Sequence, residues 1–331
     1  MKRTLILIFL LFVIKSTGMA QEFIDSDGRI KVLVVKNNYE GPETIYNGGL
    51  KDILSKYGDL VQSSTAKLTE AEENEYGEWN RAAIESRSIG NLISVHEQND
   101  YFTLGLLKNC SDLIGMLAGL QNMSPDMKAK DSRNLQNSGL AGNKPLKIGL
   151  VWIDAHADFN TPETSLSGMH GGMPVAIAAG MCLTRLRLKS GLDPALPTKY
   201  ITMACLRDVD PLEQELLDRS QCDFISVNDV RNLTDNLTDQ IERLAGLTDL
   251  IYVHIDMDVL DPAEVSGHPL TAPEGPTSVE LAKALELMFS NDKCNALGIA
   301  SMPYGKNDPE GLSLKATYNL IGGALKGVSK R

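Results

Sequence analysis

The sequence predicts a three-layer α/β fold in which helices cover both faces of a mostly parallel sheet. Short apolar or β-branched runs alternate with longer stretches whose apolar residues recur at helical spacing, and no repeat or low-complexity tract interrupts this alternation. Strands separated by helices need crossover connections, which make neighbouring strands parallel and bury both faces of the sheet. At 331 residues with 43% hydrophobic content, the chain is long enough to bury one large core.

Seven runs are predicted to form strands: Ile30–Val35, Tyr101–Leu107, Ile148–Ile153, Tyr200–Leu206, Asp223–Val227, Leu250–Ile255 and Ala296–Met302. Helical spacing is clear in the stretches Ser111–Leu120, Pro211–Arg219 and Ser278–Phe289. The polar stretch Gln121–Lys144 is predicted to be a surface loop, because the alternation of strands and helices resumes after it. We therefore expect residues 21–331 to form a single catalytic domain.

The first 20 residues have the pattern of a signal peptide. Lys2 and Arg3 precede an apolar run from Leu5 to Ile14, and small residues at Gly18 and Ala20 offer a cleavage site. The apolar run is too short to span a bilayer comfortably. We expect the mature protein to be secreted or periplasmic; an uncleaved N-terminal anchor is the alternative.

The net charge of −11 argues against binding to nucleic acid or to an acidic membrane, because like charges repel. The excess of carboxylates is consistent with hard cations, and equally with a solvated acidic surface. The five cysteines are scattered and odd in number, so they do not resemble a disulfide framework, and at least one thiol should remain free.

Carboxylates follow two of the predicted strands. Asp154, His156 and Asp158 follow the predicted strand Ile148–Ile153. Asp256 and Asp258 follow the predicted strand Leu250–Ile255. In extended backbone, residues two apart point to the same side, so we expect the five side chains to converge where the strands end. Carboxylate oxygens with one imidazole suit hard to borderline divalent ions, and cations would offset the repulsion among buried acids. The alternative is that Asp154 and Asp256 only cap helices or turns.

The segments DAHADFNTPETS and HIDMDVLDP resemble the two signature segments of the arginase–agmatinase (ureohydrolase) family, and the resemblance extends through most of the chain from about Cys110. It implies a three-layer α/β subunit that holds two manganese ions and assembles as a homo-oligomer, a trimer or hexamer. It also implies that Asp154 and Asp256 bridge both ions, that His156 and Asp258 complete one site, and that Asp158 serves the other. Two cations would make water acidic enough to supply hydroxide for attack on a guanidino carbon, with Asp158 moving the proton.

Two positions depart from the family pattern. Cys110 stands where the family places a histidine ligand; it is either a softer metal ligand or a plain buried thiol. Ser301 stands where arginases place a glutamate that pairs with the guanidinium, and no acid follows until Asp308. Loss of a bidentate clamp suggests a neutral head group, such as an N-hydroxyguanidine.

Three further histidines are interpreted individually. His170, in a glycine-rich segment, lies one residue out of register with a family histidine that handles protons near the leaving amine, so it is a general acid or merely exposed. His254 is expected in the core or behind the ligands. His268 carries no signal beyond a surface loop.

Four residues resemble the family's amino-acid subsite. Asn160 and Ser167 match positions that receive an α-carboxylate, and Asp210 and Glu213 match acids that hold an α-amino group. Asp210-Pro-Leu-Glu213 is equally the pattern of a helix start, and both roles can hold at once.

The sequence therefore predicts an enzyme that hydrolyses the guanidino C–N bond of arginine or N-hydroxyarginine to ornithine plus urea or hydroxyurea, with a small-molecule guanidino amino acid as its partner. The alternatives are a hydrolase of another guanidino or amidino compound and a non-catalytic metal-binding protein of the same fold.

Overall fold

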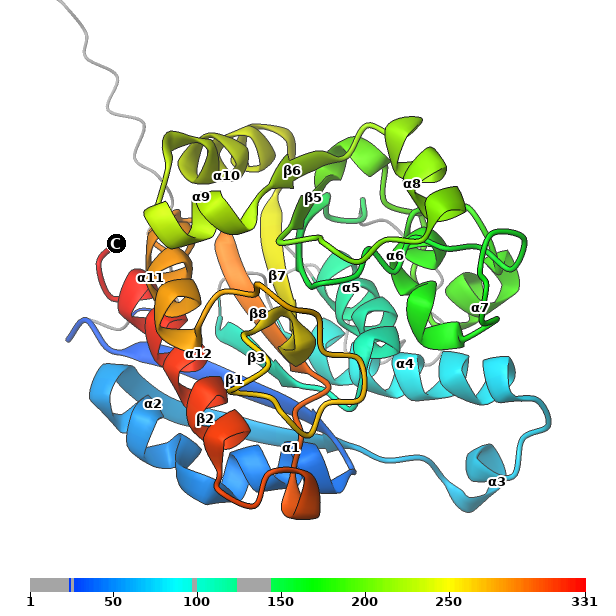
Figure 1. The fold of residues 1–331 in the computed structure, drawn as a ribbon. Coiled ribbons are helices and arrows are strands. Elements are labelled where there is room, and N and C mark those ends of the chain that lie inside the picture. The colour runs from blue at the N-terminus through cyan, green and yellow to red at the C-terminus, as the bar shows by residue number, and fades with distance from the viewer. Residues whose placement is uncertain (1–23, 25–26, 97–99, 124–143) are drawn as a thin grey trace, which may run out of the picture.

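The computed structural model describes residue 24 and residues 27–96, 100–123 and 144–331. Its described strands form one eight-stranded sheet in the order β2-β1-β3-β8-β7-β4-β5-β6, and all pairings within it are parallel, as predicted (Figure 1). The strands are β1 (Ile30–Asn37), β2 (Gly58–Ala66), β3 (Phe102–Leu106), β4 (Ile148–Ile153), β5 (Ile201–Ala204), β6 (Asp223–Ile225), β7 (Leu250–Asp256) and β8 (Cys294–Ala300).

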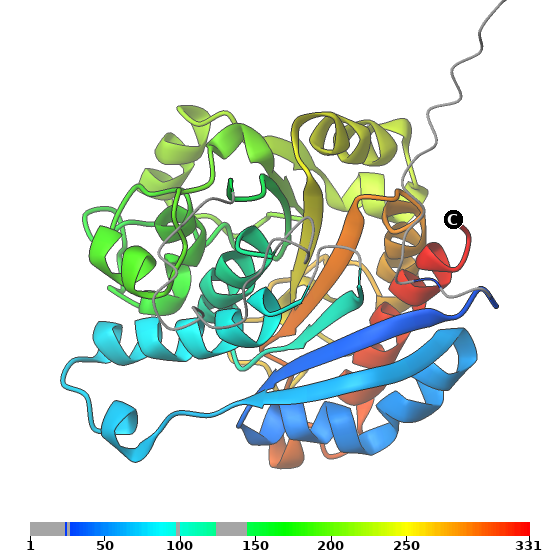
Figure 2. The same ribbon diagram turned by 180° about the vertical axis from the view of Figure 1, so that it is seen from behind.

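Helices cover both faces of the sheet. Figure 1 shows α11 and α12 over one face, and Figure 2 shows α4 and α5 crossing the other. The α-helices are α1 (Glu40–Ile45), α2 (Lys51–Tyr57), α3 (Glu70–Glu73), α4 (Glu78–Ser94), α5 (Leu113–Gln121), α6 (Pro174–Ala178), α7 (Thr184–Lys189), α8 (Pro211–Asp218), α9 (Val227–Asn232), α10 (Asp235–Leu247), α11 (Ser278–Met288) and α12 (Leu312–Val328). The three-layer αβα architecture predicted from the sequence is confirmed.

Each face of the sheet has its own hydrophobic core, which explains why the strands read as continuous apolar runs. Along β1, Val32 and Val34 pack into the core beneath α10, α11 and α12, whereas Leu33 and Val35 pack into the core beneath α4, α5 and α6. Successive side chains of a strand point to opposite faces, so a strand covered on both sides must be apolar at every position.

The sequence prediction missed β2. This strand is rich in polar residues (GDLVQSSTA) and lies at the edge of the sheet, where it pairs only with β1. An edge strand with one neighbour does not need the continuous apolar pattern of a central strand. The prediction for β8 was wrong in its bounds: β8 begins at Cys294 and ends at Ala300, because Ser301 has the left-handed backbone φ of 62°.

Strand order places the functional edge of the molecule. The neighbours β3, β8, β7 and β4 are parallel, so the residues that follow them meet at one edge of the sheet.

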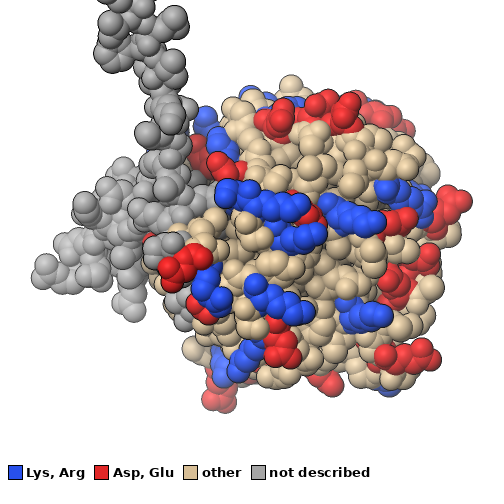
Figure 3. Space-filling model, turned by 90° about the vertical axis from the view of Figure 1, so that its left-hand side faces the viewer, with Lys and Arg blue, Asp and Glu red and all other residues tan. Residues whose placement is uncertain are grey.

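The predicted signal peptide and most of the predicted surface loop Gln121–Lys144 lie outside the described residues. On the face seen in Figure 3, Lys and Arg side chains lie among Asp and Glu side chains, so the two signs of charge are mixed there. Within the described ranges, no helix has both the length and the apolar character needed to cross a membrane.

Candidate metal centre

The two predicted acidic motifs meet at the ends of β4 and β7. These strands are hydrogen-bonded neighbours, with Ile153 opposite Ile255, so Asp154 and Asp256 leave the sheet side by side. Both carboxylates are buried, as are those of Asp158 and Asp258. The expected convergence of the acids is therefore present in the fold.

The convergence does not arise from extended backbone, and that part of the sequence reasoning was wrong. After β4 the chain bends, and Oδ1 of Asp154 accepts a hydrogen bond from the backbone N–H of His156 (2.7 Å). After β7 a 3₁₀ turn begins, and Oδ1 of Asp256 accepts one from the N–H of Asp258 (2.9 Å). Aspartate favours such a turn, in which its side chain bonds the backbone two residues on. The two-residue spacing thus reflects two matching turns.

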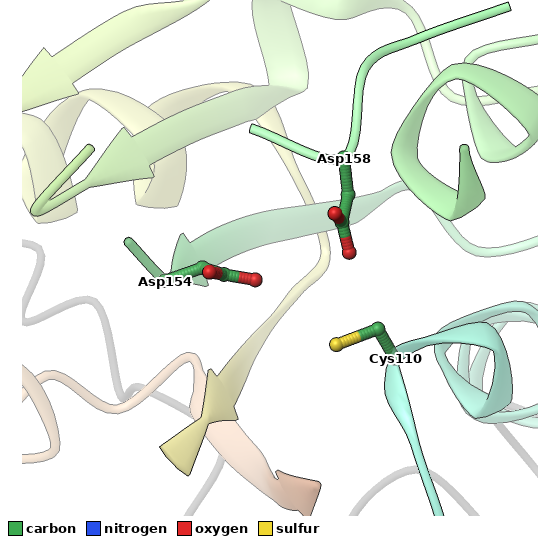
Figure 4. A group of neighbouring side chains, drawn as sticks. All are labelled: Cys110, Asp154 and Asp158. Atoms are coloured by element: carbon green, nitrogen blue, oxygen red, sulfur yellow. The ribbon is translucent and has the colours of Figure 1, made fainter. Parts of the chain in front are cut away.

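Side chains from three parts of the chain surround a common volume. Cys110, at the start of a 3₁₀ turn after β3, points toward Asp154 and Asp158 (Figure 4). The potential ligand atoms of these three residues lie within 4.8 Å of one another. Two further groups of the same tightness share members with it and extend the cluster: Asp154, His156 and Asp258, and then Asp256, Asp258 and His268. All five ligands predicted from the acidic motifs belong to this cluster.

The cluster contains more acidic side chains than basic ones. Burial, followed by the neighbouring Asp258 carboxylate, raises the pKa of Asp154 well above its usual range, and burial with Asp256 does the same to the pKa of Asp158. Burial and Asp258 raise the pKa of Asp256 to about 6. Burial alone would raise the pKa of Asp258 too, but its contact with His156 holds it below its usual value. A site that penalises negative charge in this way fits divalent cations, which would offset both the repulsion and the lost hydration.

His156 lies between two of these acids. Its Nδ1 lies 3.1 Å from Oδ2 of Asp258 and 3.4 Å from Oδ1 of Asp154. Burial would lower the pKa of His156, but these two contacts raise it to about 11. The Trp152 indole N–H donates to the His156 carbonyl (3.2 Å), which fixes the backbone beside the cluster. An imidazole held among carboxylates suits a borderline ion such as manganese.

The side chain of Cys110 is buried and directed into the cluster. Its Sγ donates a hydrogen bond to Oδ2 of Asp256 (2.5 Å), and the Ser301 hydroxyl donates to the same oxygen (2.7 Å). Burial and the Asp256 carboxylate raise the pKa of the Cys110 thiol well above its usual value. The position of the sulfur is compatible with metal ligation. Asp308, the next acid after Ser301, instead accepts hydrogen bonds from the backbone at the start of α12.

The interpretation of His268 as a residue without signal was wrong. Its side chain is 7% exposed, and its Nε2 lies 3.7 Å from Oδ1 of Asp256. The loop that follows β7 folds back, so that His268 lies beside the end of β7. A histidine ten residues beyond Asp258, in the loop that follows a ligand-bearing strand, was the available signal. His254, by contrast, lies in the core as expected: it stacks on Trp152 with ring centroids 4.5 Å apart.

His170 lies beside the cluster, not within the groups of potential ligands. Its Nδ1 is 3.0 Å from the Ser111 hydroxyl, and its Nε2 is buried and has no hydrogen-bond partner among the described residues. Burial lowers the pKa of His170, so its neutral form is favoured. Together with Ser111, Arg81 and Lys108 it lines a cavity of about 320 Å³. His170 is therefore partly buried and held in place by its contact with Ser111.

The four residues of the predicted amino-acid subsite divide into a bonded set and an exposed residue. Asn160 donates to Oδ2 of Asp210 (3.1 Å), and Asp210 is the N-cap of α8, as the helix-start pattern predicts. Glu213 accepts from the backbone N–H groups of Phe159 (2.7 Å) and Asp210 (3.3 Å). Ser167 is exposed on the following loop. Asn160, Asp210 and Glu213 thus tie the loop after β4 to α8.

Arg207 binds the loop that follows β7 and was missed by the sequence reasoning. Its guanidinium donates to the carbonyl oxygens of Asp258 (3.3 Å), Val259 (3.1 Å) and Ala272 (3.1 Å), and also to that of Pro273 (2.8 Å). The fork of N–H donors on arginine suits several carbonyls at once. It links the loop after β5 to the loop that carries His268.

The fold and the buried carboxylates define an α/β protein with a candidate metal centre at the carboxyl ends of its parallel strands. A family model described as the arginase family matches residues 136–300. Hepatic arginase of Aquarana catesbeiana is 32% identical over 181 residues, which cover 52% of this chain and 56% of that enzyme. Arginase of Brevibacillus brevis is 25% identical over 265 residues, which cover 76% and 81%.

The crystal structure of arginase from Bacillus cereus is similar in fold, with a TM-score of 0.71 and 20% identity over 89% of this chain and 98% of that one. The sequence match spans only about half the length of the Aquarana catesbeiana enzyme. Sequence and fold agree: the chain belongs to the arginase family.

Proposed function

We propose that the protein is a metal-dependent hydrolase that cleaves a guanidino C–N bond of an arginine-like amino acid, releasing ornithine plus urea or hydroxyurea. The observation that carries this proposal is the buried cluster of four aspartates and His156 at the ends of β4 and β7. Similarity to arginases supports the reaction class. Hydrolysis of another guanidino or amidino compound is the second candidate, favoured by Ser301 in the place of an acid.

Two divalent cations, manganese by preference, would be held by six residues: Cys110, Asp154, His156, Asp158, Asp256 and Asp258. When bound, such cations make water acidic enough to supply hydroxide near neutral pH. The chain's own groups would do the rest. Asp158 would accept a hydrogen bond from the attacking water and take its proton. His170, which is neutral at rest, would first take up a proton and then deliver it to the leaving amine.

The amino-acid end of the substrate would bind near Asn160, Ser167 and Asp210. The α-carboxylate would take donors from Asn160 and Ser167, and the α-ammonium would take an acceptor from Asp210. Glu213 would act mainly by holding Asp210 and the loop after β4 in position, since both of its described acceptor bonds go to the backbone. We also propose that residues 1–20 direct export of the protein and that it assembles into a trimer or hexamer.

Ornithine release tests the function directly. The full chain, loaded with Mn²⁺ and freed of excess metal, should release ornithine from L-arginine or N-hydroxy-L-arginine and leave agmatine intact. The variant Asp256→Asn should lose the activity, whereas Asp249→Asn, an acid before β7, should keep it. Metal-loaded protein that releases no ornithine from either substrate contradicts the proposal, and cleavage of agmatine alone would favour the second candidate.

A further inference from the structure

The loop that carries His268 is held tightly against the C-terminal part of the chain. A Cβ added to Gly267 would lie 1.8 Å from the carbonyl oxygen of Asn307, so only glycine allows this approach. The His268 N–H donates to the carbonyl of Val265 (2.8 Å), which closes a turn. Glu264 accepts from both the N–H and the hydroxyl of Ser278, at 2.5 and 2.8 Å. The ring of His268 is therefore positioned by the backbone on both sides of it.

One nitrogen of His268 is already occupied. The backbone N–H of Leu270 donates to Nδ1 (3.2 Å), so Nδ1 is an acceptor. With Nδ1 accepting this hydrogen bond, the N–H of the ring is on Nε2. This tautomer disfavours His268 as a metal ligand through Nε2, because ligation there would need the proton on Nδ1, facing the Leu270 donor.

The Nδ1 of His268 lies 4.0 Å from Oδ2 of Asp258, and the Nε2–H of the same ring faces the candidate metal centre. It lies 3.7 Å from Oδ1 of Asp256, beyond ordinary hydrogen-bond length, and that oxygen already accepts the N–H of Asp258. The described hydrogen bonds give this donor no acceptor. Ser301 cannot accept a guanidinium as a carboxylate would, and its hydroxyl already donates to Asp256. This part of the candidate site therefore offers a substrate a hydrogen-bond donor, the Nε2–H of His268.

We propose that His268 is a specificity-determining residue whose Nε2–H donates a hydrogen bond to a lone pair on the head group of the substrate. A guanidinium is unsuited to this contact, because each of its nitrogens carries hydrogen and none offers a lone pair. A neutral hydroxyguanidine or amidine offers such an acceptor. The inference rests on the proposed function and sharpens it: the head group that the site selects is neutral and accepts a hydrogen bond.

Equilibrium binding of isolated head groups tests this without turnover. Metal-loaded protein is titrated by calorimetry with hydroxyguanidine and with guanidinium chloride, at a pH where hydroxyguanidine is neutral. The wild type should bind hydroxyguanidine about tenfold more tightly, and His268→Phe should lose most of that preference. His268→Gln, which keeps an N–H donor, should retain part of it. His96→Phe, a histidine packed on Tyr101, is the matched control and should behave as the wild type.

Each outcome decides the inference. Equal affinity for the two probes in the wild type, binding of neither, or an unchanged ratio in His268→Phe overturns it. Loss of bound metal in His268→Phe, with the fold retained by thermal melting, also overturns it by making His268 a ligand. Failure of the ornithine assay alone would overturn the proposed reaction and leave the head-group preference standing.

The tautomer is tested on the protein alone. Long-range ¹H–¹⁵N correlation spectra of ¹⁵N-histidine-labelled protein, assigned by the signal lost in His268→Gln, should show the proton on Nε2 and none on Nδ1. A proton on Nδ1 would contradict the inference.

Discussion

Cys110 and Asp256 are joined by a hydrogen bond of 2.5 Å across the strand that separates them. Cys110 follows β3 and Asp256 ends β7, with β8 between them in the sheet. Ser301, which follows β8, donates to the same carboxylate oxygen. Cys110 and Ser301, the two positions where the sequence is predicted to depart from the family pattern, therefore contact the same carboxylate.

If Cys110 is a ligand, Cys110→Ser should lower the affinity for one of the two ions about 10- to 100-fold, because serine supplies no thiolate. Titration with Co²⁺ checks this, since a cobalt–thiolate bond gives a charge-transfer absorption that the variant should lack. Cys182→Ser, away from the cluster, is the control. Unchanged affinity and no such absorption in the wild type would make Cys110 a plain buried thiol.

Arg207→Ala should reduce the free energy of unfolding by about 2 kcal/mol, because the variant leaves several backbone carbonyls without donors. Denaturant titration measures the change. The comparison is Arg219→Ala, which removes an exposed pair with Glu215 and should cost under about 0.5 kcal/mol. Equal effects of the two variants would mean that Arg207 does not organise its loop.

Gly267→Ala should reduce the free energy of unfolding by about 1–3 kcal/mol, since the new Cβ collides with the backbone of Asn307. Gly246→Ala, where nothing lies within 4 Å of the new Cβ, should instead stabilise α10 by about 0.5–1 kcal/mol. Thermal melting compares them. A neutral Gly267→Ala would show that the His268 loop is not held as described.

Asp229→Asn should destabilise the protein by about 1 kcal/mol at pH 7, a figure that allows for solvent screening of this partly exposed side chain, and by progressively less in acid. Partial burial would raise the pKa of Asp229, but hydrogen bonds from Thr234, which follows α9, and from Ser226, at the start of α9, lower it to about 2. A lowered carboxylate pKa stabilises the fold above the usual value of 3.8, and this contribution is lost as the pH falls toward 2. Denaturation at pH 7, 4 and 2.5 measures the difference, and a constant gap would contradict this origin.

The sequence predicted the central strands and their acidic ends because those features are local. A strand covered on both faces must be apolar throughout, so β4 and β7 stand out, and Asp154 and Asp256 mark where they end. β2 could not be recognised because an edge strand carries no such pattern.

Residues placed by contacts between distant segments were equally out of reach. His268 approaches Asp256 from a loop whose Gly267 packs on Asn307, and Arg207 donates to carbonyls more than 50 residues away. The sequence reasoning also took the turns that bring the acids together for extended backbone, because both geometries place acids two residues apart on the same side.

The most direct test of a shared metal centre is anomalous diffraction from crystals of the full chain soaked in Mn²⁺. Two strong peaks should appear between the carboxylates of Asp154 and Asp256 and near no other group of acids. Crystals that show no anomalous signal among these residues, while surface carboxylates bind the ion, would contradict the account.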